Sequence, residues 1–81
     1  MSQGLFGGEA SIKVSMALAY DANGNVLYLG QAPPGAATSA AIWQIRRFTY
    51  DANGNMTAIW WADGNTVYDN IWDDRATLSY S

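Results

Sequence analysis

The sequence predicts an all-β domain, a small antiparallel β-sandwich or barrel of about six strands built from tight Asn-Gly hairpins. The first reason is a string, Tyr-Asp-Ala-Asn-Gly-Asn, that occurs at 20–25 and again at 50–55. Asn-Gly between apolar runs is the strongest short-range hairpin signal, because both residues tolerate a positive φ. The second reason is the period-two alternation of apolar residues around these turns, which is typical of strands.

The repeated string predicts two related hairpins, thirty positions apart (Tyr20 to Tyr50). A weaker signal of the same kind, with Asp-Gly in place of Asn-Gly, follows at 63–64. Two copies are too few for a solenoid, which needs about three stacked repeats, so we expect one sandwich made from two hairpins. The turn-forming residues are predicted to be Asn23, Gly24, Asn53, Gly54, Asp63 and Gly64.

The first ten residues contain three glycines around a single Leu5-Phe6 pair. Because glycine adds conformational entropy and the segment has no periodicity, we expect a flexible N-terminal arm over 1–10, followed by a single β domain over 11–81. Phe6 is the predicted anchor of the arm. The arm either lies over a neighbouring subunit or frays as an ordinary terminus.

The first strand is expected at 11–20, where one face is apolar and the other carries small residues. The apolar face is predicted to point into the core. A second strand follows at 26–29, where every residue is apolar or aromatic, which favours a strand covered on both faces. The residues of the apolar face of the first strand are Ile12, Val14, Met16 and Leu18.

Pro33-Pro34 lies in the one long irregular stretch, 31–40, and is predicted to carry the chain from one sheet to another. The next strand, 42–50, contains Arg46-Arg47, which interrupts its alternation and suggests a β-bulge. An acidic turn is expected at 69–74. The remaining strands are predicted at 56–61, 66–68 and 76–80.

The composition favours association with other chains. The 81 residues include neither Cys nor His, which excludes disulfides and thiolate or imidazole zinc sites. Charged residues make up 14% of the chain, against roughly 25% in ordinary soluble domains, while 49% are hydrophobic. Because a domain of this size has a marginal core, we expect a homo-oligomer or docking onto another protein; the alternative is a compact monomer with a polar, uncharged surface.

Charge and hydropathy exclude two classes of partner. The net charge is −3 and the four basic residues are scattered, so no basic stripe for nucleic acid is present. No stretch reaches the roughly 18 apolar residues of a membrane span. Residues 1–9 lack the basic and apolar regions of a secretory signal, which predicts synthesis in a cytoplasm.

No residue constellation predicts catalysis or a cofactor. The Asp and Asn residues of the repeated string alternate as in calcium loops, but Val26 and Met56 stand where those loops need glycine, and Ala32 and Ala62 where they need Glu. Asp73-Asp74 is the one adjacent acidic pair and has no His, Cys or phosphate loop beside it. We therefore expect no enzyme activity, and we expect these carboxylates either to form an ion pair with Arg46, Arg47 or Arg75 or to cap a turn.

The aromatic residues are the best candidates for a binding surface. Trp60 and Trp61 are adjacent, so on a strand one indole faces the core and the other faces outward. An outward Trp is typical of a subunit interface or of a binding anchor, and aromatic platforms also bind sugars, so a carbohydrate- or receptor-binding module is the alternative. The predicted interface residues are Phe6, Trp60, Trp61 and Trp72.

The run from Trp43 to Asn55, with Trp-Ala-Asp-Gly-Asn at 61–65 and Trp-Asp-Asp-Arg-Ala at 72–76, resembles small bacteriophage virion proteins. The resemblance covers about the C-terminal half of the chain. It implies a non-enzymatic component of a tailed phage particle, made in the bacterial cytoplasm and localised to the virion, with capsid, portal, neck or tail proteins as partners. Capsid decoration, a neck or collar protein and a tail or fibre adaptor stay open. The turn strings also resemble the tyrosine-aspartate repeats of large toxin shells, but those chains carry many copies.

Overall fold

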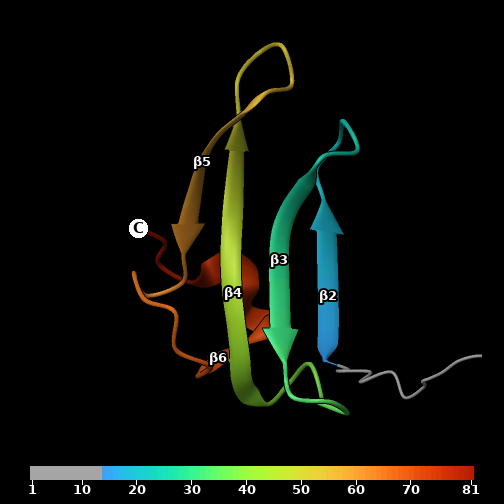
Figure 1. Ribbon diagram of the computed structural model, residues 1–81, viewed down its shortest axis with the longest axis vertical. Helices are drawn as coiled ribbons and strands as arrows, with labels where there is room; N and C mark the ends of the chain where they lie inside the picture. Colours follow the sequence, from blue (N-terminus) through green and yellow to red (C-terminus); the bar gives the residue numbers. More distant parts are fainter. Residues whose placement is uncertain (1–13) are drawn as a thin grey trace, which may run out of the picture.

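The computed structural model describes residues 14–81, which form an antiparallel sheet with the strand order β2-β3-β4-β5 (Figure 1). A short strand, β6, pairs with the start of β4, and a 3₁₀ helix, η1, follows it. The elements are β2 (Ser15–Tyr20), β3 (Val26–Ala32), β4 (Ala41–Tyr50), β5 (Met56–Trp61), β6 (Asn70–Ile71) and η1 (Trp72–Thr77). The predicted all-β class is confirmed.

The second layer of the domain is not a sheet. Within residues 14–81 every strand belongs to one sheet, and η1 lies behind β3 and β4 in Figure 1. Both Asn-Gly turns lie at one end of the sheet, and the proline-containing loop lies at the other. That loop joins β3 to its sheet neighbour β4, so the expected crossing between two sheets is wrong.

The C-terminal quarter of the chain departs from the predicted strands. The expected strand at 66–68 is irregular. The expected strand at 76–80 is also absent, because η1 extends to Thr77 and the residues after it form only a single bridge, between Ala62 and Tyr80. The acidic pair lies in the first turn of η1, where carboxylates interact favourably with the helix N-terminus. The N–H of Asp73 also donates to the Thr38 carbonyl (3.1 Å), which ties η1 to the proline loop.

The core lies on the face of the sheet that η1 covers. The indoles of Trp43 and Trp72 pack with their ring centroids 5.9 Å apart, against Ile45 and Ala32. Gly30 makes this packing possible, because a Cβ at that position would lie 2.5 Å from Cε3 of Trp72. The core of the domain is therefore formed by two tryptophans that pack on the sheet where Gly30 has no side chain.

The C-terminus is held against the same face by Tyr80. Its ring lies 5.7 Å from that of Tyr28, and its hydroxyl donates to the Arg75 carbonyl (2.7 Å). Burial raises the pKa of Tyr80 to about 12. The C-terminal segment thus closes over the first hairpin with a neutral, hydrogen-bonded phenol.

The alternation of β2 is present, but its orientation is the reverse of the prediction. Ala17 and Ala19 face the core, while Met16 and Leu18 point to the open side of the sheet. The reason is steric: the tryptophans and Tyr28 fill the covered side, so only small β2 side chains fit there. Period-two alternation defines two faces but does not say which of them is covered.

Candidate functional site

The two repeated strings fold into turns of the same geometry. In the first, Oδ1 of Asp21 accepts the backbone N–H groups of Asn23 and Asn25, both at 2.9 Å. In the second, Oδ1 of Asp51 accepts those of Asn53 and Asn55, again at 2.9 Å. Gly24 and Gly54 have φ of 84° and 83°. Each aspartate therefore uses its own carboxylate to shape its turn, and the glycine supplies the left-handed backbone.

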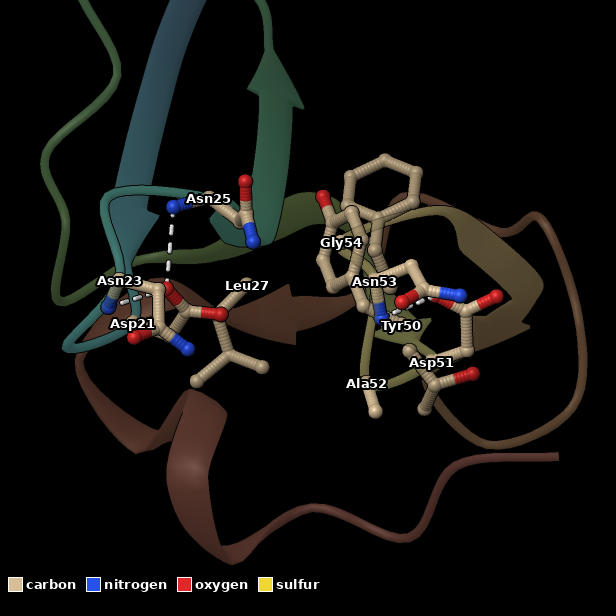
Figure 2. A pocket seen from close by; sticks show the side chains of 11 residues that line it. Asp21, Asn23, Asn25, Leu27, Tyr50, Asp51, Ala52, Asn53 and Gly54 are labelled. Carbon is tan, nitrogen blue, oxygen red and sulfur yellow. Dashed lines mark hydrogen bonds between the residues drawn. The ribbon is translucent and has the colours of Figure 1, made fainter.

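A cleft of about 600 Å³ separates the two turns (Figure 2). Its rim carries carboxylate and amide groups, and its floor carries Leu27, Phe48 and Tyr50 on the open side of the sheet. The hydroxyl of Tyr50 donates to the Val26 carbonyl (2.6 Å) and so fastens the second hairpin to the first. The polar rim residues are Asp21, Asn23, Asn25, Asp51 and Asn53.

The electrostatics of the cleft come from its aspartates. Hydrogen bonds from the backbone of Asn55 and Asn53, opposed by some desolvation, hold the pKa of Asp51 below the ordinary value of an aspartate carboxyl. In both aspartates Oδ1 is the oxygen that accepts the turn backbone. Within residues 14–81 no group of three His, Cys, Asp or Glu side chains is arranged to hold a metal ion.

Trp60 and Trp61 point to opposite faces of β5, and each meets one of the two adjacent arginines. Trp61 lies on the open face, with the Arg46 guanidinium 4.6 Å from its ring centroid. Trp60 lies on the covered face, with Arg47 at 6.0 Å, and is still 36% exposed at the edge of the sheet. The pairs are in register, Arg46 opposite Trp61 and Arg47 opposite Trp60, so the predicted bulge at the arginines is wrong. Shifts occur instead between Thr49 and Tyr50, and at two other strand ends.

The arginines pair with aromatic rings rather than with carboxylates. Arg46 also donates to the side-chain oxygens of Gln31 (2.7 Å) and Gln44 (2.9 Å). Arg75 lies over the ring of Trp72, at 4.7 Å from its centroid. Within the part of the chain that the structure describes, no ion pair joins these arginines to an acidic residue, so the expected pairing with Asp73-Asp74 is not found. Cation–π contacts take its place.

The predicted interface residues do not lie together. Trp72 is 6% exposed and belongs to the core, so its indole offers no free surface and the prediction that placed it at an interface is corrected. Phe6 lies outside the described residues. Trp60 is left at the edge of β5 and Trp61 on the open face.

The open face of the sheet was not among the predicted sites. Apolar side chains of β2 and β5 stand on it without a covering layer among residues 14–81, including Met16, which is 54% exposed, and Ile59, which is 49% exposed. Phe48 is buried in the middle of this face and joins the two flanks. Gly30 is the residue that could have indicated it. A glycine within an otherwise apolar strand indicates that a bulky group packs on the face to which its side chain would point, and the opposite face is then the open one. The exposed apolar residues of β2 and β5, with the residue before β2, are Val14, Met16, Leu18, Tyr20, Met56 and Ile59, together with Trp60 on the covered face.

Comparison with protein-family models, with curated proteins and with solved structures finds no match to this chain. Among residues 14–81 there is also no helix with the length and apolar character needed to cross a membrane.

Proposed function

We propose that this chain is a non-enzymatic structural component of a bacteriophage particle, a capsid decoration, neck or collar protein, or tail or fibre adaptor, that acts by assembling with other proteins of the virion. The observation that supports this most is the open apolar face of the sheet. Large side chains from β2 and β5 share it, and several are about half exposed. Contiguous apolar surface of this kind marks protein–protein contact sites.

Two further observations support an assembly role. The chain has few charges for its length, so it keeps little of the charged surface that favours an isolated monomer. The resemblance of 43–55, 61–65 and 72–76 to small phage virion proteins gives the proposal its biological setting. Partners of this kind are the capsid, portal, neck or tail proteins of the same particle.

The test is to locate the chain in a lysate of infected host cells. Intact particles are separated on a density gradient, and an antibody against the purified chain is used to probe every fraction. We expect the chain to sediment with the particles and to stay with them through a high-salt wash, since apolar contacts are not screened by salt. A chain that stays in the soluble fraction, with particles of normal composition lacking it, contradicts the proposal.

Saccharide binding is the second candidate, and the cleft between the turns is the observation that favours it. Asn23 and Asn53 line it, together with the ring of Tyr50, and amide and aromatic groups are the usual partners of sugars. A glycan array tests this candidate. Specific signals that disappear in an Asn23→Ala, Asn53→Ala double variant support it, and an array without specific signals rejects it.

A further inference from the structure

The two edge strands of the sheet are β2 and β5. Their outward backbone N–H and C=O groups are arranged like those that join the internal strands β3 and β4. Trp61 exchanges both backbone hydrogen bonds with Ser81, so its N–H and C=O point away from β4. Backbone groups alternate in direction along a strand, so those of Ile59 point outward as well. The same alternation, followed across β4 and β3, turns the backbone groups of Met16 and Leu18 outward from β2.

These outward groups have no ladder partner among residues 14–81, because β2 pairs with β3 alone and β5 with β4. The C-terminal residues cover the end of the β5 edge at Trp61, which leaves its 56–60 part free. An edge strand with unpaired backbone groups is a template for another strand. Most residues of the two edges, 14–20 and 56–60, are also apolar. None of them carries a charge that would oppose pairing with another strand.

The internal repeat shows which strand fits. The β3–β4 ladder already joins the second strand of one hairpin to the first strand of the next, with Leu29 opposite Arg46 and Tyr28 opposite Arg47. The repeat period is thirty positions (Tyr20 to Tyr50). Adding it to β3 gives the equivalent positions in β5, and subtracting it from β4 gives the equivalent positions in β2. The same ladder between two molecules then places Ile59 of one opposite Met16 of the other, and Ala58 opposite Ala17.

A tyrosine supplies independent support for this arrangement. Tyr50, at the end of β4, donates to the carbonyl of Val26, the first residue of β3. Its counterpart Tyr20, at the end of β2, is 58% exposed. A second molecule whose β5 lies along β2 brings the carbonyl of Met56, the counterpart of Val26, to the position that the Tyr20 hydroxyl needs.

We infer that a second copy of this chain docks its β5 edge, through residues 56–60, along the β2 edge of the first, and so continues the sheet from one molecule to the next. β5 runs antiparallel to β2 in this arrangement, as β3 does to β4. The contact joins two different surfaces, so it repeats until it closes into a ring or extends as a fibre. It also forms between molecules the same cleft, between the Asp51 turn of one and the Asp21 turn of the next. The inference deepens the proposed assembly role and rests on it.

Paired charges on the two edges test the inference in the full-length chain. Light scattering over a concentration series is expected to show association of the wild type, because both edges are complementary. Met16→Lys and Ile59→Glu are each expected to lower the association constant at least about tenfold, since each places a charge in the ladder. Mixing the two variants is expected to restore association, because each supplies the intact edge that the other lacks and the altered edges attract.

The matched control is Leu29→Glu, thirty positions before Ile59 (Leu29 to Ile59) and on the same open face. Its backbone pairs inside the sheet, so this variant is expected to associate like the wild type. If Leu29→Glu abolishes association while both edge variants still associate, the inference is overturned in favour of face-to-face docking. Tyr20→Phe is expected to weaken association by roughly two- to tenfold, the value of one hydrogen bond.

Three results overturn edge pairing: a wild type that is monomeric at every concentration, edge variants that associate normally, and a mixture that stays monomeric. Ile59→Glu that still dimerises alone indicates pairing of β2 with β2 and also overturns it. Where Met16→Lys or Ile59→Glu does not fold by circular dichroism, Leu18→Lys and Thr57→Glu form the second pair. If the chain is found in phage particles but the charge substitutions leave its association unchanged, the proposed function stands and this inference fails. If the charge substitutions act as expected but the chain is absent from phage particles, the inference stands and the proposed function fails.

Discussion

The two hairpins share six residues and one turn geometry, yet their surroundings differ. The second is tied to the first through the Tyr50 hydroxyl on Val26, while the equivalent Tyr20 is exposed at the edge of the sheet. The first hairpin has no side chain at Gly30, where Trp72 packs, while the second hairpin carries Trp60 at the equivalent position. The turn sequence therefore fixes only the turn. The role of each hairpin depends on what lies beside it.

The largest difference between the hairpins is the residue at position 30 against that at position 60. Gly30→Val places a branched side chain where Trp72 and Trp43 now lie, with the first Cβ contact at 2.5 Å. We expect a loss of about 3 kcal/mol in the free energy of unfolding, the upper range for overpacking a core. In a domain of this size this lowers Tm by about 12 °C or more, measured by thermal denaturation.

The second variant in this comparison replaces the overlapping group. Gly30→Val combined with Trp72→Leu opens space for the new side chain, so the two substitutions are expected to destabilise less together than the sum of their separate effects. Additive losses in this double-mutant cycle would mean that the glycine is required for a reason other than contact with Trp72.

A smaller effect is expected from the tyrosines. Tyr50→Phe removes the hydroxyl that joins the hairpins and leaves the Val26 carbonyl without that donor, at a cost of about 1 kcal/mol in unfolding free energy. Tyr20→Phe removes an exposed hydroxyl and is expected to change the stability of the dilute monomer by less than about 0.5 kcal/mol. Urea denaturation of both variants at low concentration measures the difference. Equal losses would mean that Tyr20 has a partner within its own chain.

The turns were predictable because their chemistry is local. Asp, Asn and Gly at fixed positions supply the side-chain acceptor and the positive φ of each turn, so 20–25 and 50–55 indicate hairpins without knowledge of the rest of the chain. The all-β class follows from the same turns and from the alternation around them. The inward and outward positions of Trp60 and Trp61 also follow from strand geometry alone.

The rest depended on contacts that no local pattern records. The predicted orientation of β2 was wrong because the orientation is decided by Trp43 of β4 and Trp72 of η1, which are distant from β2 in the sequence. The segment from Trp72 forms a 3₁₀ helix since it must place one indole in the core and turn back toward Ala62. The adjacent arginines suggested a bulge, but each stacks on a tryptophan of the neighbouring strand, a pairing that becomes visible once the register is known.

The smallest effect concerns the charge of one turn. Oδ1 of Asp51 accepts two backbone N–H groups, Oδ2 accepts the Asn55 side chain at 3.4 Å, and the pKa of this carboxyl is lowered from 3.8 in the folded protein. A lowered folded-state pKa means that the carboxylate adds stability above the unfolded-state value, and that this part is lost as the pH falls through the folded-state value. Asp51→Asn keeps an acceptor oxygen but removes the charge. It is therefore expected to destabilise the protein slightly at about pH 6 and to converge with the wild type at about pH 2, as urea denaturation at the two pH values measures. A constant difference at both values would show that the oxygen's geometry, rather than its charge, stabilises the second turn.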